Sequence, residues 1–301
     1  MRFEPGSGRG SSIGHEIVTG THDLDATDLF DRATLAHLID AAGTDRLRIG
    51  TMGHDPAQTG EWVDVDRDGR CGTEVLEAVD RGRLWVNILG AERLDTRFES
   101  VRDAIHAALR QEAPHLDVRS VTIGVLVSSP KALVYFHADA EPNLVCHIAG
   151  TKRVWIYPAL DFDLVDPMDL AAVFAGGDEE LPYDPRFDLV ATTVDLVPGS
   201  FVSWPQNAPH RIVNGDQVNV TLTVSYSTPA ADRRIAVWSA NRWWHETFGL
   251  RMRPETEAGP GVAAKIAIFR TLRKLSIADR SPRRDRLFAS RLDPDAPDGR
   301  S

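Results

Sequence analysis

The stretch VYFHADAEPNLVCHIAGTKRVWIYP (134–158) decides how the rest of the chain is interpreted. It contains a His-Ala-Asp triplet, His137 to Asp139, and a lysine, Lys152, fifteen residues after the histidine. Side chains two positions apart on a β-strand lie on the same face, so a strand that opens with the triplet places His137 and Asp139 together. The pair is therefore a candidate for two ligands of a metal ion.

Short β-branched segments separated by turns surround this stretch. Between residues 118 and 228 they read VRSVTIGVLVSS, ALVYFHAD, NLVCHIAG, KRVWIYP, DLVATTVDLVPGSFVSWP, HRIVNG and QVNVTLTVSYS. So many strands at close spacing, with almost no helix between them, predict a barrel or sandwich. An acidic insert with a short helical piece, 160–186, interrupts the strands. By position, this insert and the strand at 83–89 are the candidates for lining the substrate entrance.

The flanking regions divide the chain of 301 residues around this core. Residues 1–82 carry helix and strand patterns that we expect to pack on a core domain at 83–228, and the first residues are rich in Gly and Ser, which predicts poor order. Residues 229–275 have the pattern of C-terminal helices. The Arg-rich, Pro-punctuated tail, 276–301, is predicted to be flexible.

Composition excludes several classes of protein. The formal net charge is −10, from 34 basic and 44 acidic residues, which argues against a protein that grips a nucleic-acid backbone. The two cysteines, Cys71 and Cys146, form no CxxC pair, which argues against a disulfide framework and a structural zinc site. The chain has no run of 18 apolar residues and no apolar core of a signal peptide, so we expect a soluble cytoplasmic protein without membrane contact.

His210 is the best candidate for a third metal ligand. It lies in VPGSFVSWPQNAPHRIVNG, after a Pro-Gly turn, a strand and a Pro-bounded loop, at the start of a new strand. Two histidines and a carboxylate on one face of an octahedron are typical of non-heme Fe(II) oxygenases, because three positions stay open for a co-substrate and O₂. The triplet alone is weak evidence; its place in an all-β region that also holds His210 strengthens it.

Taken together, these motifs resemble the JmjC and cupin-like 2-oxoglutarate oxygenases, in particular their small asparaginyl-hydroxylase-like branch. The resemblance covers about residues 83–228. The second half of the family pattern is VPGSFVSWPQNAPHRIVN, with Ser200 where the family usually has Asp. The first half is matched, ahead of VWIYP, by His137, Asp139, Asn143, Gly150, Lys152 and Arg153.

The resemblance implies a double-stranded β-helix (cupin or jelly-roll) core, mainly β, with helical N-terminal elements and C-terminal helices. It implies an Fe(II)- and 2-oxoglutarate-dependent dioxygenase that hydroxylates a C–H bond of a protein, peptide or small molecule, using O₂ and forming succinate. Related hydroxylases dimerise through C-terminal helices, which makes GVAAKIAIFRTLRKL a candidate for a homodimer interface. The tryptophans of NRWWHETFG are expected to pack against the barrel or a second subunit.

The resemblance also implies roles for single residues. His137, Asp139 and His210 would bind Fe(II), and Lys152 would pair with the distal carboxylate of 2-oxoglutarate, since a buried ammonium needs an anion. Asn143 would lie near the co-substrate. Without the resemblance, a solvated turn after Gly150 is the better explanation of Lys152 and Arg153.

The surroundings of the distal carboxylate differ from those in the asparaginyl hydroxylase. Val134 stands where that relative has a Thr that helps to hold the carboxylate, and Trp85 stands where it has a Tyr; the indole N–H of Trp85 can donate a hydrogen bond. Three residues could supply the missing hydroxyl: Thr122, Ser128 and Ser225.

His147 and Asn87 are expected to lie in the pocket wall. His147 shares strand parity with Asn143 and should face the same side, either as a polar wall residue near the substrate or as a satisfied core histidine. Two other functions stay open: a metal-dependent cupin enzyme that does not use 2-oxoglutarate, and a non-catalytic cupin that binds a ligand or partner.

Overall fold

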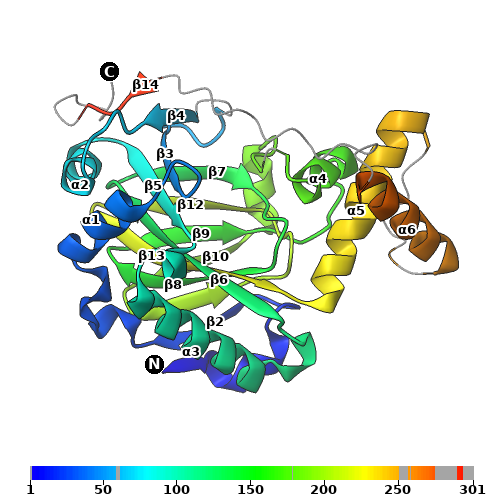
Figure 1. The fold of residues 1–301 in the computed structure, drawn as a ribbon, viewed down its shortest axis with the longest axis horizontal. Coiled ribbons are helices and arrows are strands. Elements are labelled where there is room, and N and C mark those ends of the chain that lie inside the picture. The colour runs from blue at the N-terminus through cyan, green and yellow to red at the C-terminus, as the bar shows by residue number, and fades with distance from the viewer. Residues whose placement is uncertain are drawn as a thin grey trace.

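The computed structural model describes residues 2–58, 62–177, 179–250, 257, 259–274 and 290–293. Their strands form two facing sheets, and helices cover one sheet and flank the other (Figure 1). The chain is mainly β, with a jelly-roll core and flanking helices, as the sequence predicts. No described helix is long and apolar enough to cross a membrane.

The larger sheet holds ten strands of the described residues, all antiparallel to their neighbours except the last. In spatial order they are β1 (Phe3–Pro5), β2 (Val18–His22), β11 (Ser200–Ser203), β8 (Asn143–Ala149), β13 (Asn219–Ser227), β6 (Ser120–Ser128), β5 (Leu84–Leu89), β3 (Leu47–Thr51), β4 (Val63–Asp66) and β14 (Ser290–Arg291).

The smaller sheet holds four antiparallel strands. In spatial order they are β10 (Thr192–Leu196), β9 (Lys152–Ile156), β12 (His210–Asn214) and β7 (Leu133–His137).

The helices belong to two groups. In the first, α1 (Arg32–Ala41), α2 (Gly72–Arg81) and α3 (Thr96–Glu112) lie on the outer face of the larger sheet, and in the second, α4 (Pro167–Phe174), α5 (Pro229–Phe248) and α6 (Pro260–Lys274) lie together at the other side of the molecule (Figure 1). Short 3-10 turns are η1 (Gly6–Ser12), η2 (Leu24–Ala26), η3 (Asp28–Phe30), η4 (Ala91–Arg93), η5 (Pro114–Leu116) and η6 (Pro185–Val190).

Alternation along the strands separates two apolar cores. On β8, Leu144 and Cys146 face the helices of the first group, whereas Val145 faces the space between the sheets. Val154 and Ile212 of the smaller sheet join Val145 there. Because side chains alternate, residues an even number of positions from Val145, Val154 or Ile212 on the same strand also face the barrel interior.

The first residues are ordered, contrary to the expectation from their Gly and Ser content. Strands β1 and β2 pair with each other, and β2 pairs with β11 of the core. At Gly20 on β2 an added Cβ would lie 2.3 Å from both the Glu4 carbonyl oxygen and the Phe201 ring, so glycine is needed there for close packing. Composition indicated disorder, but the small residues serve this close approach.

The two chain ends also revise the expected division. Strands β3 and β4 extend the core sheet, so residues 1–82 contribute to the sheet as well as packing on it. In the tail, Ser290 and Arg291 pair with β4 and Leu292 is buried; the rest of 276–301 lies outside the described residues, apart from Asp293.

Candidate metal centre

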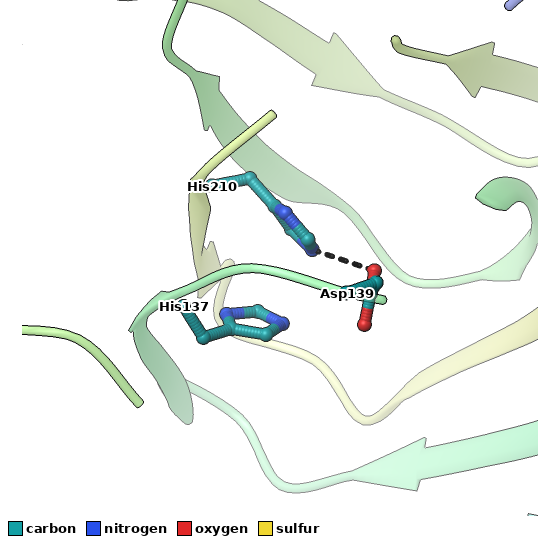
Figure 2. A group of neighbouring side chains, drawn as sticks. All are labelled: His137, Asp139 and His210. Carbon is teal, nitrogen blue, oxygen red and sulfur yellow. Dashed lines mark ion pairs between the residues drawn. The ribbon is translucent and has the colours of Figure 1, made fainter. Parts of the chain in front are cut away.

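Two neighbouring strands of the smaller sheet bring the three predicted metal ligands together. His137 is the last residue of β7, His210 is the first of β12, and the two are cross-strand partners. The nearest ligand atoms of His137, Asp139 and His210 all lie within 4.8 Å of one another, and His210 Nε2 is 3.6 Å from Asp139 Oδ2 (Figure 2). Asp139 lies in the loop after β7, so the triplet ends a strand instead of opening one.

A β-bulge aims His137 at this point. Register along β7 and β12 pairs His210 with His137 and Ile212 with Val134, so three residues of β7 span what two residues of β12 span. The extra residue lets Val134 and His137 face the same side, although an odd spacing would otherwise put them on opposite faces. Val134 accordingly packs in the barrel interior beside Ile212.

Backbone carbonyls set the tautomer of both histidines. His137 Nδ1 lies 2.8 Å from the Tyr135 carbonyl oxygen, and His210 Nδ1 lies 3.1 Å from that of Ala208. A carbonyl only accepts, so each Nδ1 carries the proton and each Nε2 presents its lone pair. Burial, followed by the nearby His137, lowers the pKa of His210 to about 3, so this ring is neutral near pH 7.

Amide side chains hold the loop that carries Asp139. Asn143 Nδ2 donates to Asp139 Oδ2 at 3.2 Å, Asn207 Nδ2 donates to the Asp139 carbonyl oxygen at 3.2 Å, and Gln206 Nε2 donates to that of Ala140 at 2.8 Å. The Oδ1 atoms of Asn143 and Asn207 are buried without a hydrogen-bond partner among the described residues. Imidazole Nε2 atoms, an oriented carboxylate and orphaned amide oxygens together fit a divalent metal ion.

Gln206 and Asn207 were not predicted from the sequence as part of the site. Both belong to the Pro-bounded segment before His210, where Asn207 has a left-handed φ of 64°. An Asn in a tight loop just ahead of a metal ligand was the available signal, because Asn tolerates that conformation and can bind neighbouring backbone.

Lys152 lies two residues before Val154 on β9, so its side chain also faces the barrel interior and is not part of a solvated turn. The residue is only 6% exposed, and no carboxylate of the described residues lies within ion-pair distance of its ammonium. Burial lowers its pKa to about 7. Arg153, by contrast, points outward and pairs with Asp195 at 2.6 Å.

Hydroxyl and amide groups lie at the Lys152 end of the barrel. Asn214 is the cross-strand partner of Lys152, and its Nδ2 donates to Ser128 Oγ at 2.8 Å and to the Ser129 carbonyl oxygen at 2.9 Å. Because Ser128 Oγ accepts from Asn214, its own proton is available for a further acceptor. Asn214 was missed, although it shares parity with His210 and Ile212 in HRIVN.

Thr122 and Ser225 lie at the end of the barrel opposite Lys152. They are cross-strand partners, and Ser225 also pairs with Asn143, so the register places both residues at the end of the barrel where Asn143 lies and not at the Lys152 end. Trp85 pairs with Ser128 in the sheet, and its ring packs edge-on against Trp62 at 5.1 Å between centroids.

The two predicted wall residues, His147 and Asn87, differ in their hydrogen bonding. His147 faces the interior as expected, is fully buried, and interacts with Thr221 Oγ1 at 3.2 Å and the Gly150 carbonyl oxygen at 3.0 Å. Burial, then the charge of Lys152, lowers its pKa to about 3, which describes a satisfied neutral core histidine. Asn87 lies on β5, and its Oδ1 is buried without a hydrogen-bond partner among the described residues.

Comparison with known proteins finds likeness in structure but not in sequence. No protein-family model matches the chain, and no curated protein matches it significantly. The structure of Escherichia coli ycfD is 14% identical, with a TM-score of 0.51 over 90% of this chain and 66% of that chain.

Two further structures are described as YcfD, a ribosomal oxygenase from Escherichia coli. One, in complex with cobalt and 2-oxoglutarate, is 15% identical, with a TM-score of 0.45 over 85% of this chain and 61% of that chain. The other, in complex with cobalt and succinic acid, is 14% identical, with a TM-score of 0.44 over the same shares. This chain thus spans less than two thirds of the length of these structures. What the comparison shows is the fold: the chain shares the jelly-roll architecture of Escherichia coli ycfD.

Proposed function

We propose that the protein is an Fe(II)- and 2-oxoglutarate-dependent oxygenase that hydroxylates a C–H bond. One observation carries the proposal: the barrel has three side chains that could hold a divalent metal at one end, and at the other a buried ammonium with no ion-pair partner among the described residues. Ile156, which pairs with His210, is four residues from Lys152 on β9, or ~13 Å along the strand. A lysine side chain and a five-carbon dicarboxylate together can span that separation.

The chemistry of Lys152 calls for an anion. An ammonium removed from water is costly unless it is paired, and a carboxylate makes a charge-assisted hydrogen bond with it. We propose that Ser128 donates its free proton to the same carboxylate and so replaces the hydroxyl that Val134 cannot supply. Thr122 and Ser225 would then act near the metal, with Asn143.

The residues of the chain would bind, orient and shield the reactants. His137, Asp139 and His210 would hold Fe(II), which when bound with the co-substrate supplies the oxidative chemistry. Aliphatic side chains between the two ends, among them Val134, Val154 and Ile212, would exclude water. The YcfD structures are of an oxygenase that takes cobalt and 2-oxoglutarate, which is compatible with this arrangement; a protein, peptide or small molecule would be hydroxylated.

Calorimetric titration with 2-oxoglutarate tests the proposal. Binding is expected in the presence of Mn(II) and not in its absence, since the metal would take one end of the molecule. Pyruvate, which keeps the 2-oxo acid but lacks the distal carboxylate that Lys152 would pair with, is the control and should bind at least tenfold more weakly. Metal-loaded protein that does not bind 2-oxoglutarate would contradict the proposal.

The lowered pKa of Lys152 also leads to a prediction of how the stability of the protein without co-substrate depends on pH. Its pKa is about 7 in the folded chain, against an ordinary value of 10.5, so the unfolded chain binds more protons between these pH values. The free energy of unfolding should therefore rise with pH in this range, by about 1.4 kcal/mol per pH unit from this group. Urea unfolding of the wild type and Lys152→Met at pH 7 and 9 measures it: their difference should shrink at the higher pH, and an unchanged difference would contradict the prediction.

A further inference from the structure

The acidic insert packs behind the strand that carries His137. Phe136 and Ala138, on either side of His137, point away from the barrel into a core shared with Leu170 and Phe174 of α4 and with Trp238 of α5.

The insert also pairs with the end of β7: the Leu181 amide donates to the Phe136 carbonyl oxygen at 2.9 Å, and the Ala138 amide donates to that of Glu179 at 3.1 Å. These contacts anchor the insert at the end of the strand that carries His137.

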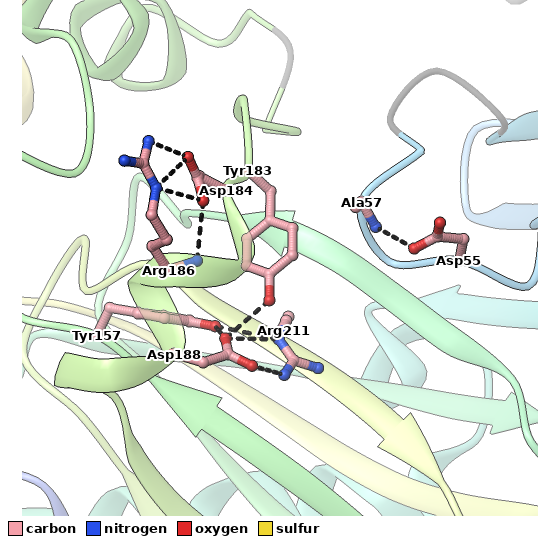
Figure 3. A network of polar contacts seen from close by, with 8 residues as sticks. All are labelled: Asp55, Ala57, Tyr157, Tyr183, Asp184, Arg186, Asp188 and Arg211. Carbon is pink, nitrogen blue, oxygen red and sulfur yellow. Dashed lines mark hydrogen bonds and ion pairs between the residues drawn. The ribbon is translucent and has the colours of Figure 1, made fainter.

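A second set of contacts lies behind His210. The next residue, Arg211, faces outward yet is only 6% exposed. Its guanidinium stacks over the Trp155 ring at 3.6 Å from the centroid. It also donates to Tyr157 Oη at 3.1 Å and pairs with both carboxylate oxygens of Asp188 in η6 (Figure 3). Asp188 belongs to the segment that follows the predicted insert.

Asp188 collects donors from three directions. Besides Arg211, Tyr157 Oη donates to its Oδ1 at 2.5 Å and Tyr183 Oη at 2.8 Å (Figure 3). Burial alone would raise the pKa of Asp188, but these hydrogen bonds outweigh burial and lower it, so the carboxylate is ionised near pH 7. Four hydrogen bonds on one carboxylate and a stacked guanidinium permit a single arrangement of the segment against the sheet.

We propose that Asp188 and Arg211 are positioning residues, and that residues 179–188 hold the two histidine-bearing strand ends at their spacing from outside the barrel. Pairing with 179–181 fixes the end of β7, and the Arg211–Asp188 pair fixes the start of β12. The proposal rests on the proposed function only in that His137, Asp139 and His210 bind a divalent metal.

The same sheet offers a matched control. Arg153 and Asp195 also form an ion pair on its outer face, at 2.6 Å, but both side chains are more than half exposed and lie at the Lys152 end. An exposed pair contributes little, so Asp195→Asn removes an equivalent charge without touching the support of the histidines.

Titration with Co(II), followed by calorimetry and by visible absorption, tests the proposal in full-length protein. Asp188→Asn is expected to weaken Co(II) binding about tenfold, the lower limit for groups that support metal ligands, and to alter the Co(II) spectrum. Tyr157→Phe, which removes one donor, should change both in the same direction but less. Asp195→Asn should change neither.

A purely structural role would lower the melting temperature of the variants but leave the Co(II) affinity and spectrum of the folded protein intact. Asp188→Asn protein with wild-type affinity and spectrum therefore overturns the proposal, as does an equal effect of Asp195→Asn. If Asp188→Asn does not fold, Tyr157→Phe decides by the same two measurements. A wild-type chain that binds no Co(II) overturns the proposed function first, and the positioning role with it.

Discussion

His210→Ala is expected to abolish metal-dependent turnover of 2-oxoglutarate. The substitution removes a neutral Nε2 ligand whose orientation is set by the Ala208 carbonyl, and no other described group of three His, Cys, Asp or Glu residues is placed to hold the metal. Loss of a ligand should cost more than the roughly 100-fold that loss of a group supporting a ligand costs. Succinate formed per mole of protein with added Fe(II), and Mn(II) affinity by calorimetry, measure the two consequences.

His54→Ala is the matched control, because His54 is exposed and lies outside the candidate site. It should retain wild-type turnover and Mn(II) affinity. His210 also contacts the rings of His137 and Trp204, so the melting temperature of His210→Ala has to be measured as well. Folded His210→Ala protein that still forms succinate at the wild-type rate would show that the triad is not the metal site.

Lys152→Met is expected to have opposite effects on co-substrate binding and on stability. Removing the buried ammonium leaves the distal carboxylate unpaired, which should weaken 2-oxoglutarate binding by about 3–5 kcal/mol, or at least ~100-fold, with Mn(II) affinity unchanged. Without co-substrate the same change removes a buried charge that has no ion-pair partner among the described residues, so the free energy of unfolding at pH 7 should rise by roughly 1–4 kcal/mol. Calorimetry and urea unfolding measure the two.

Arg153→Met is the matched control for Lys152→Met, because it removes a positive charge that is exposed instead of buried. Arg153 is the neighbour of Lys152, but it points outward and its ion pair with Asp195 is exposed, so both measurements should stay near wild type. If Lys152→Met binds 2-oxoglutarate as tightly as the wild type, the protein is better explained as a metal-dependent cupin enzyme that does not use this co-substrate. Metal binding without any turnover would instead favour a non-catalytic cupin.

Local patterns predicted the strands of the barrel, and the family resemblance assigned the candidate site residues. Alternating β-branched segments mark the strands of both sheets, because a strand with one buried face must alternate. The spacing of His137 and Asp139, with His210 at a strand start, predicted three candidate ligands that the fold brings together. The family resemblance added Lys152, which lies at the other end of the barrel.

Contacts between distant segments account for what the sequence did not predict. The bulge in β7 depends on its register with β12, and Val134 at an odd spacing from His137 gave no sign of it. Asn214 and Ser128 are 86 residues apart and meet only when the two sheets face each other. Asp188 likewise meets Arg211 from 23 residues away, so an acidic composition alone could not indicate a role behind the metal centre.

The short strands at both ends of the larger sheet have a consequence for solubility. β1 has three residues and ends in Pro5, and β14 has two, so each leaves little unpaired backbone for another chain to join. Removing residues 1–22 would uncover the edge of β11 and the Phe201 ring, on which Phe3 stacks at 4.1 Å. Such a truncation should show itself as concentration-dependent self-association, while the metal ligands on the opposite sheet stay in place.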